Sequence, residues 1–492
     1  MSKTVKELFS GIQCTIIGNE NEEVSGVAFN SRDVKPGDIF FCIVGLKADG
    51  HTYAQDAIDR GAKVLVCERS LSTADTSDVT LVMVGDSRRA MARIASRYYD
   101  TPSEHFKLVG ITGTNGKTTT TYLVEHIAQM ASMKTAVVGT VGIRIGDETL
   151  KSSHTTPESV DLQKLFCKMD KECCDVVAIE VSSHALDLDR VWASRFAVTA
   201  FTNLTQDHLD YHKTFESYFE AKARLFSPDY PAKRVICIDD KWGKELLRRC
   251  SGQGDDVITT GFTTAAQIHP INVEYLSDRT RMLVEVRGAQ YQLDYPLVGK
   301  FNVSNIMTAL GIGIQLGIPA DVVVSALNDA PQIPGRLQRV PSKADCGFSV
   351  YVDYAHTPDA LEKALGAVKA ITTGRTIVVF GCGGDRDTTK RPIMGSVALG
   401  ADYAIVTSDN PRTEDPAAIV DDILAGMTGH EDRYEVHVDR REGIAAAIAV
   451  AKPGDSILIA GKGHEDYQLV GDQVLSFDDV KVAEEELNRA FC

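Results

Sequence analysis

The stretch FKLVGITGTNGKTTTTYLVEHIAQM, residues 106–130, decides the fold class of this chain. An apolar strand runs into a turn containing two glycines, and a helical pattern follows at once. Glycines let a backbone wrap around a phosphate, the helix N-terminus carries a partial positive charge, and Lys117 reaches toward the β- and γ-phosphates of a nucleotide. The hydroxyl of Thr118 suits Mg²⁺. The sequence therefore predicts a strand–loop–helix phosphate site.

The loop departs from the strict G-x₄-G-K-[ST] pattern, because Ile111 stands where the first glycine would be. A bare GK[ST] triplet also occurs at ordinary helix starts with a glycine turn. The strand before the triplet and the helix after it favour phosphate binding over that alternative.

Apolar runs in the rest of the chain predict an α/β protein of three domains. Residues 1–104 hold short apolar runs split by turns, typical of a small α/β domain. Residues 105–335 hold β-branched runs alternating with helical patterns, as parallel strands buried on both faces do, then a more polar stretch that alternates like antiparallel strands. Residues 336–492 again hold apolar runs that alternate with helical patterns, which indicates a doubly wound, Rossmann-like domain. A length of 492 residues fits several domains.

Composition excludes some functions. The formal net charge of −16 argues against a general nucleic-acid binder, which shows a basic face. The eleven cysteines are scattered and form no CxxC pair, which favours reduced thiols. We find neither a signal peptide nor an apolar run of 18 residues, so we expect a cytoplasmic protein that does not contact a membrane.

Two strand ends carry groups that suit a metal ion. Glu180 stands where the run VVAIE stops, and His208 and Asp207 follow the next strand in TNLTQDHLDYH. A carboxylate, an imidazole and the Thr118 hydroxyl fit Mg²⁺ shared with phosphates. Singly, a solvent-facing carboxylate and a capping or core histidine explain these residues equally well. Downstream of a phosphate loop, the set predicts a metal site.

Lys222 lies on an otherwise apolar helical stripe with Tyr218, Leu225 and Phe226. A lysine in such a place usually extends its ammonium to water, and the pattern alone favours that interpretation. The alternative is a buried amine whose pKa is depressed and which reacts with CO₂ to give a carbamate, an oxygen ligand for a metal.

Three polar loops follow strands of the last domain: GCGGDRDTTKRP at 381–392, TSDNPRTEDP at 407–416 and AGKGHEDYQ at 460–468. Loops at the carboxyl ends of parallel strands share one rim of the sheet. We therefore expect the three loops to face one ligand, although each alone resembles a surface turn.

Together these segments resemble the Mur ligase family over essentially the whole chain. The resemblance is carried, in order, by NSR with PGDIFF, GTNGKTT, HTTP, EVSSHAL, NLTQDHLDYH, YFEAKARLF, GKFNVSN, PGR, DYAHTPDAL, GCGGDRD, DNPR and GKGHEDYQ. It implies an amino-terminal domain for the UDP end of a substrate, a central ATPase domain and a carboxyl-terminal domain for the incoming amino acid. It also implies small-molecule substrates, ATP and Mg²⁺ as cofactors, and we expect a monomer.

The resemblance assigns residues to each ligand. Those implied for ATP are Gly113, Thr114, Asn115, Gly116, Lys117, Thr118, Thr119, Asn302, Asn305, Arg336 and Asp353. Those implied for the metal are Thr118, Glu180, His208 and Lys222 as a carbamate, so the resemblance overturns the preference for an exposed lysine. Those implied for the UDP-sugar-peptide are Phe29, Ser31, Leu46, Lys47, Ala48, His154, Thr155, Thr156, Ser182, Leu188 and Arg190. Those implied for the amino acid are Arg386, Asp409, Asn410, Pro411, Arg412, Gly461 and Glu465.

Two positions depart from the family pattern. Asn30 stands where aspartate is usual, and Leu188 stands where some relatives carry glutamine, which puts one substrate hydrogen bond in doubt.

The implied reaction is ATP-dependent amide-bond formation through an acyl phosphate, with Lys117, Lys222, His208 and Arg336 in catalytic roles. The implied amino acid is meso-diaminopimelate, because Arg412 can grip its distal carboxylate bidentately and Glu465 suits its distal ammonium. The alternatives are a lysine-adding ligase of the same family and a non-catalytic nucleotide-binding homologue. Arg412 speaks against the first, and the presence of the lysines, Glu180 and His208 speaks against the second.

Overall fold

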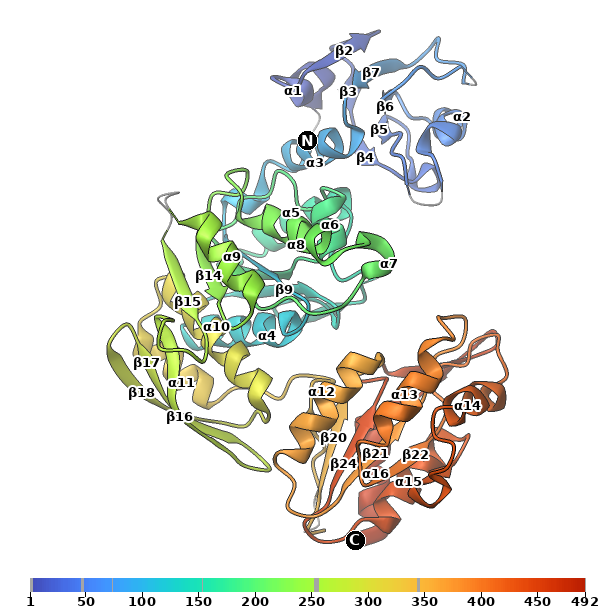
Figure 1. Cartoon of the computed structure of the whole chain (residues 1–492). Coiled ribbons are helices and arrows are strands. Elements are labelled where there is room, and N and C mark those ends of the chain that lie inside the picture. The colour runs from blue at the N-terminus through green and yellow to red at the C-terminus, as the bar shows by residue number, and fades with distance from the viewer. Residues whose placement is uncertain are drawn as a thin grey trace. The chain divides into compact units, whose positions relative to one another are not determined.

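The computed structural model describes residues 3–45, 48–72, 74–152, 154–251, 256–342 and 346–491 (Figure 1). The predicted substrate contacts Leu46 and Lys47 lie outside these residues. The chain divides into two compact units, Met1–Thr259 with Gly311–Pro319 and Thr260–Leu310 with Ala320–Cys492. The predicted domain boundaries at 104/105 and 335/336 stay predictions. No helix in the described part of the chain is long and apolar enough to cross a membrane.

The first unit begins with a small α/β layer. Its five-stranded sheet has the order β2 (Cys14–Ile17), β7 (Thr80–Val84), β6 (Val64–Cys67), β5 (Asp38–Phe41) and β4 (Gly26–Ala28). Only β2 runs antiparallel to its neighbour. The helices here are α1 (Val5–Phe9), α2 (Ala54–Asp59) and α3 (Ser87–Tyr98), and β1 (Lys3–Thr4) pairs with β3 (Glu23–Val24).

A larger sheet follows in the same unit. Strand β8 (Lys107–Thr112) lies between β12 (Val176–Glu180) and β13 (Val198–Phe201), all parallel. Beyond them lie β9 (Thr135–Gly139), beside β12, and β14 (Lys233–Cys237), beside β13. These strands are almost entirely buried, which confirms the prediction from their β-branched runs. The antiparallel strands β10 (Gly142–Ile145) and β11 (Glu148–Leu150) continue the sheet, and no sequence pattern predicted them.

Helix α4 (Lys117–Met130) begins at the end of the glycine turn and packs against β8, β9 and β12. The other helices of this sheet region are α5 (Ser159–Lys171), α6 (Ser183–Asp187), α7 (Leu209–His212), α8 (Phe215–Ala223) and α9 (Lys241–Cys250).

The second unit contains two sheet regions. Strands β16 (Ile268–Tyr275), β17 (Thr280–Val286) and β18 (Ala289–Tyr295) pair antiparallel, as their alternation predicted, and α11 (Ala320–Asn328) packs on β18. Helix α10 (Lys300–Gln315) precedes α11. The six-stranded sheet has the order β19 (Gln338–Arg339), β20 (Ser349–Asp353), β24 (Ser456–Ala460), β21 (Thr376–Phe380), β22 (Tyr403–Val406) and β23 (Tyr434–Val436).

This six-stranded sheet is parallel except at β19. One apolar core joins it to α12 (Pro358–Lys369), α13 (Lys390–Ala398) and α14 (Pro416–Leu424). A second core joins it to α15 (Arg440–Val450) and α16 (Asp479–Phe491). The two cores use alternate residues of the same strands, so helices cover both faces. The doubly wound, Rossmann-like prediction and the α/β class are confirmed. The hairpin β25 (Tyr467–Val470) and β26 (Gln473–Ser476) was not predicted.

Candidate active site

The phosphate loop between β8 and α4 takes a shape that its glycines make available. Gly113 has φ 148°, and a Cβ built there would lie 1.9 Å from Oγ1 of Thr202. Gly116, at the N-cap of α4, has φ 87°. Both values lie in the region that favours glycine, and the close approach at Gly113 excludes any side chain.

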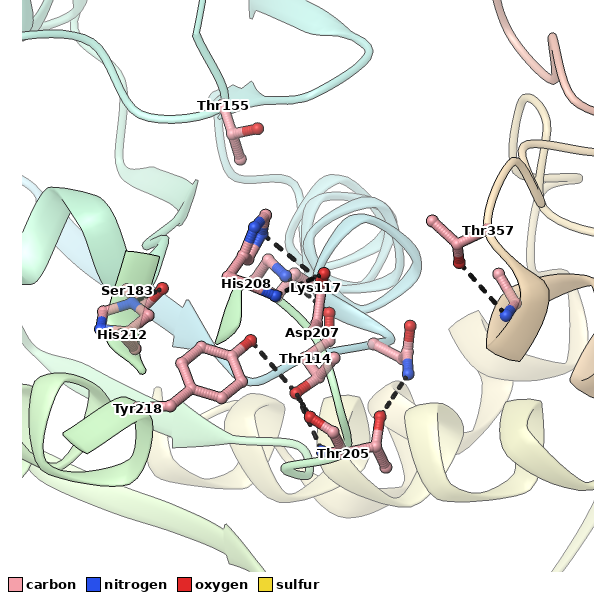
Figure 2. A network of polar contacts seen from close by, with 12 residues as sticks. Thr114, Lys117, Thr155, Ser183, Thr205, Asp207, His208, His212, Tyr218 and Thr357 are labelled. Carbon is pink, nitrogen blue, oxygen red and sulfur yellow. Dashed lines mark hydrogen bonds and ion pairs between the residues drawn. The ribbon is translucent and has the colours of Figure 1, made fainter. Parts of the chain in front are cut away.

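The segment that follows β13 holds this loop in place (Figure 2). The Thr114 N–H donates to the carbonyl of Asn203 at 2.8 Å, and the Thr202 hydroxyl donates to the carbonyl of Asn115 at 2.6 Å. The Asn115 amide donates to the Thr205 hydroxyl at 3.2 Å. The loop is therefore ordered by its own protein contacts.

Two lysine side chains share one carbonyl of the loop. Lys117 Nζ donates to the carbonyls of Gly113 at 3.0 Å and Thr114 at 2.8 Å. Lys222 Nζ donates to the same Gly113 carbonyl at 2.8 Å. Burial, and then the nearby Lys117 ammonium, lower the pKa of Lys222 well below its ordinary value. The amine of Lys222 therefore loses its proton more easily than that of an exposed lysine, which is what carbamate formation requires.

The expectation from the helical pattern that Lys222 extends to water is wrong. The side chain is 1% exposed, because the phosphate loop covers the stripe of α8 on which it lies. The ring of Tyr218, one turn earlier and equally buried, lies 4.6 Å from Lys222 Nζ. The Tyr218 hydroxyl is 3.2 Å from Oγ1 of Thr114, so α8 contacts two successive loop residues.

Glu180, at the end of β12, is a buried carboxylate with 1% exposure. Its Oε1 accepts from the Thr140 N–H at 2.8 Å and its Oε2 from the Thr140 hydroxyl at 3.1 Å. In the part of the chain that the structure describes, no lysine, arginine or histidine pairs with it. A buried carboxylate held only by neutral donors fits a site for a cation.

His208 has φ 52° and a side chain that is 48% exposed, 3.4 Å from the carboxylate of Asp207. Partial burial and the nearby lysine ammoniums lower its pKa, although Asp207 acts against them. A neutral imidazole is the form that binds metals. His212 instead turns inward, 2.9 Å from the Ser183 hydroxyl, with its ring 5.0 Å from the ring of Tyr218. Among the described residues, no group of three His, Cys, Asp or Glu could hold a metal, so a site here needs oxygen ligands of other kinds.

Several residues assigned to the sugar-peptide substrate lie together around Glu180. The Thr156 hydroxyl donates to the Glu180 carbonyl at 2.8 Å and accepts from the Ser182 N–H at 3.1 Å. Arg190 donates to the Thr156 carbonyl at 3.0 Å. Thr155 Oγ1 lies 3.1 Å from Thr140 Oγ1.

The other two residues assigned to this part of the substrate lie less close. Leu188 is half-buried at the C-cap of α6. His154 is exposed, and its carbonyl accepts from the Ser152 hydroxyl.

The residues assigned to the UDP end lie in the small amino-terminal sheet region. Ser31 is buried at the start of the 3₁₀ turn Ser31–Asp33, and Phe29 packs at the edge of the core. Asn30 caps this turn: its oxygen accepts from the Arg32 N–H at 3.2 Å. Asparagine caps about as well as aspartate, so this departure leaves the turn intact. Ala48 is exposed.

In the second unit, the residues assigned to the nucleotide fall into two groups. Asn302 donates to the Val298 carbonyl at 2.8 Å and accepts from the Asn305 amide at 3.0 Å, and both are buried on α10. Asp353 accepts from the Leu337 N–H at 2.8 Å. Burial raises the pKa of Asp353, and Arg336 acts against that shift. The Arg336 guanidinium lies 5.2 Å from the ring centroid of Tyr354.

The three polar loops of the six-stranded sheet meet at its rim. Arg412 donates to the Gly384 carbonyl at 2.7 Å, which joins the first and second loops. The Asn410 amide donates to Glu465 at 2.8 Å, which joins the second and third. Gly461, with φ 120°, leaves room for Asp409, whose Oδ2 would lie 2.5 Å from a Cβ at that position.

Two further residues assigned to the amino-acid substrate, Pro411 and Arg386, do not take part in these bonds between loops. Pro411 is buried beside Arg412, and its carbonyl would lie 1.9 Å from a Cβ at Gly384. Arg386 is exposed and donates to the Asp385 carbonyl at 3.4 Å.

Two buried cations near this rim, Lys462 and Arg440, were not predicted from the sequence. Lys462 is fully buried, with Nζ 3.2 Å from Oδ1 of Asn410 and 3.5 Å from Oε2 of Glu465. Arg440 pairs with Asp479 at 2.7 Å in full burial. Burial raises the pKa of Glu465, while Lys462 acts to lower it. The lysine in AGKGHEDYQ is visible in the sequence, but whether the Lys462 side chain points into the protein or to solvent depends on the fold.

Comparison with known proteins defines the class. Three family models match: the Mur ligase middle domain at residues 111–313, the Mur ligase glutamate ligase domain at 335–463 and the Mur ligase catalytic domain at 23–99. The chain belongs to the Mur ligase family.

Within that family, the chain is similar to particular ligases over almost its whole length. It is 44% identical to the UDP-N-acetylmuramoyl-L-alanyl-D-glutamate–2,6-diaminopimelate ligase of Clostridium botulinum, over 97% of this chain and 98% of the relative. It is 41% identical to ligase 1 of the same description from Clostridium acetobutylicum, over 99% and 100%. A solved structure of a ligase of this description matches with a TM-score of 0.74, 32% identity and coverage of 100% and 99%.

Proposed function

We propose that this protein is an ATP-dependent ligase that joins meso-2,6-diaminopimelate to UDP-N-acetylmuramoyl-L-alanyl-D-glutamate, a step of peptidoglycan precursor synthesis. The near full-length similarity to ligases of that description supports the reaction class. The observation that carries the amino-acid choice is the rim where Arg412 and Glu465 come from loops that bond to one another.

The phosphate loop supplies the nucleotide site. We assign Gly113–Thr119 and Arg336 to the phosphates, and Asn302, Asn305 and Asp353 to the rest of the nucleotide. Lys117 now bonds to two loop carbonyls, and nucleotide binding exchanges these for phosphate oxygens. The loop changes little in that exchange because its backbone is already held by the segment after β13.

The residues around Glu180 fit a magnesium ion. The buried carboxylate without a cationic partner, the His208 imidazole with its lowered pKa and the Thr118 hydroxyl are suitable donors. Lys222, as a carbamate, would add a further oxygen ligand. Bound Mg²⁺ would neutralise negative charge on the phosphates.

The reaction then proceeds in two bond exchanges. An oxygen of the D-glutamate γ-carboxylate attacks the γ-phosphorus of ATP, and the bond between that phosphorus and the β,γ-bridging oxygen breaks. The products of this step are an acyl phosphate and free ADP. The neutral amine of diaminopimelate attacks the acyl carbon, and the tetrahedral intermediate expels phosphate and loses a proton. Lys117 and Arg336 stabilise the charge that develops on the phosphoryl group, and the substrate-binding residues hold the reactants in line.

The rim of the six-stranded sheet selects the amino acid. Arg412 binds the distal carboxylate of diaminopimelate, and Glu465 binds its distal ammonium, with Arg386, Asp409, Asn410, Pro411 and Gly461 completing the pocket. Lysine lacks that carboxylate and would leave the guanidinium without its anion, which disfavours it strongly.

Phosphate release from ATP in the presence of UDP-N-acetylmuramoyl-dipeptide tests the proposal, with meso-diaminopimelate compared against L-lysine. Turnover with diaminopimelate and little with lysine is the expected result. Turnover with lysine alone would overturn the amino-acid assignment, and no turnover with either would favour a non-catalytic nucleotide-binding protein.

We also propose a monomer of three domains, with boundaries near residues 104 and 335, that works in the cytoplasm on small-molecule substrates without a nucleic-acid or membrane partner. The acidic net charge of −16 supports the absence of nucleic acid.

A further inference from the structure

Thr140 directly follows β9 and bonds to both oxygens of the Glu180 carboxylate (Figure 2 shows the neighbouring Thr155). Its N–H donates to Oε1 at 2.8 Å and its hydroxyl donates to Oε2 at 3.1 Å. Two donors from a single residue hold the carboxylate plane in one orientation. None of the family motifs in the sequence draws attention to this threonine.

The register of the sheet makes this contact available. Strands β9 and β12 run parallel with Val138 opposite Ile179, and Gly139 and Glu180 are the residues that follow these two. A Cβ on Gly139 would lie 2.3 Å from Oε1 of Glu180. Gly139 therefore leaves the space that the carboxylate occupies, and Thr140 closes over it.

The direction of the hydrogen bonds extends to the substrate region. The Thr140 hydroxyl has one proton, and it donates that proton in a hydrogen bond to the Glu180 carboxylate. In the 3.1 Å contact between Thr140 Oγ1 and Thr155 Oγ1, the donor is therefore Thr155. Its own proton is then committed, and Thr155 Oγ1 offers only acceptor lone pairs to a ligand.

A second connection runs through the backbone. The Thr156 hydroxyl donates to the main-chain carbonyl of Glu180 at 2.8 Å. Thr155 and Thr156 are thus both attached to Glu180, one through Thr140 and one directly. Any rotation of the carboxylate disturbs the first of these connections.

We propose that Thr140 is a positioning residue that orients Glu180 toward a divalent cation and at the same time presents Thr155 Oγ1 as an acceptor to a hydroxyl or amide N–H of the sugar-peptide substrate. This rests on the proposed function, since both Glu180 and Thr155 are assigned through it. Partners that orient a metal-binding carboxylate are commonly as important for affinity as the ligand itself.

Three variants of the full-length protein test the proposal. Thr140→Val keeps the shape and the N–H but removes the hydroxyl, and Thr140→Ser keeps the hydroxyl. Thr199→Val is the matched control, because Thr199 is a buried threonine of the same sheet whose hydroxyl has no hydrogen-bond partner in the described part of the chain. Thermal melting of each variant checks that it folds.

Two binding measurements are made without the amino acid. The first is calorimetric binding of the UDP-N-acetylmuramoyl-dipeptide in EDTA, where Thr140→Val is expected to bind about 3- to 10-fold more weakly. The second is a titration with Mn²⁺ in the presence of ADP, which gives the Mn²⁺ concentration at which metal-dependent ADP binding is half-maximal. This concentration is expected to rise about 10-fold in Thr140→Val. Thr140→Ser and Thr199→Val are expected to stay near the wild type in both.

Wild-type values for Thr140→Val in either measurement would overturn the coupling. Equal losses in Thr140→Ser and Thr140→Val would also overturn it, since they would show that the methyl group and packing matter instead of the hydroxyl. Turnover by the wild type is measured separately, so absence of ligase activity would refute the proposed function while the binding measurements still decide the role of Thr140.

Discussion

The phosphate loop and the amino-acid rim are both built at the carboxyl ends of parallel strands, yet different kinds of residue shape them. In the phosphate loop, glycines take the positive φ values and the two lysines donate to backbone carbonyls. At the rim, Asp385 and Arg412 take positive φ values of 53° in addition to Gly461, and the side chains of Asn410 and Arg412 bond across loops.

From this difference we expect the phosphate loop to affect the rate of reaction and the rim to affect which amino acid is used. A site whose shape is set by the backbone accepts any ligand with the right phosphate geometry, and its lysines contribute charge. A site whose shape is set by side chains discriminates among ligands, and each substitution there alters affinity for one substrate. Substitutions should therefore affect turnover in the first region and the choice of amino acid in the second.

The largest effect is expected from Lys222→Ala. Removal of a buried group in contact with the phosphate loop should lower kcat by roughly 100-fold. Added bicarbonate should not restore activity, because no amine remains, whereas short-chain carboxylates should restore part of it. Phosphate release measures both.

The control is Lys244→Ala, which removes an exposed lysine of α9. Full activity in Lys222→Ala would exclude the carbamate from the mechanism, and a lowered melting temperature would show that the loss is one of folding.

Arg412→Ala should raise KM for diaminopimelate by about 10- to 100-fold, because it removes a charge-assisted bidentate bond. KM for ATP should change little, and Arg412→Lys should fall between. Steady-state kinetics with each substrate varied in turn measures the split. Arg441→Ala, an exposed arginine that pairs with Glu485 and Glu486, is the control. Equal losses for ATP and diaminopimelate would contradict the contrast between the two regions.

The next largest effect is expected in the pH dependence of kcat/KM for diaminopimelate, through Glu465. Burial raises the pKa of Glu465, so this carboxylate gains a proton at a higher pH than an ordinary glutamate as the solution is acidified. Attraction for the distal ammonium is lost as pH falls through that pKa and is present above it. We expect kcat/KM for diaminopimelate to fall on the acid side, and Glu465→Gln to lower it about 10-fold and remove that limb. A limb unchanged in Glu465→Gln would assign the titration to another group.

The smallest effect is expected from Tyr218→Phe. Thr114 Oγ1 donates to the Thr205 carbonyl at 3.2 Å, so the Tyr218 hydroxyl is the donor in its contact with Thr114. Burial raises the pKa of Tyr218 and keeps that proton in place. Loss of one neutral hydrogen bond should raise KM for ATP about 3-fold and leave kcat nearly unchanged. Tyr230→Phe removes a buried hydroxyl that lacks a hydrogen-bond partner among the described residues, and it should change neither.

Most of the fold and the position of the phosphate loop could be predicted from the sequence. Apolar runs such as VVAIE and the glycine turn reflect local requirements of buried parallel strands and of tight turns, which are visible residue by residue. The hairpins β10–β11 and β25–β26 were missed because short, partly exposed strands carry little apolar signal.

The site could be predicted less completely, because its contacts depend on neighbours far along the chain. The apolar stripe around Lys222 is visible in the sequence, but the loop that covers it comes from more than a hundred residues earlier. Thr140 meets Glu180 only through the register of β9 and β12. Lys462 could equally have turned to solvent, and its burial follows from the packing of three loops.

The attachment of Arg412 to the hairpin β25–β26 has a consequence for local opening motions. The Arg412 N–H donates to the Leu469 carbonyl at 3.0 Å, and the Gly471 N–H donates to the Arg412 carbonyl at 2.6 Å. Every residue of β26 is exposed, with Val474 at 69%, and a two-stranded hairpin has little stability of its own.

Hydrogen exchange at the Arg412 and Gly471 amides should therefore occur by opening of the hairpin, at a lower free energy than global unfolding. Diaminopimelate should slow it, and mild warming should erode the preference over lysine before the protein melts. Arg412, the residue that we propose selects the amino acid, is thus attached to a hairpin that has little stability of its own.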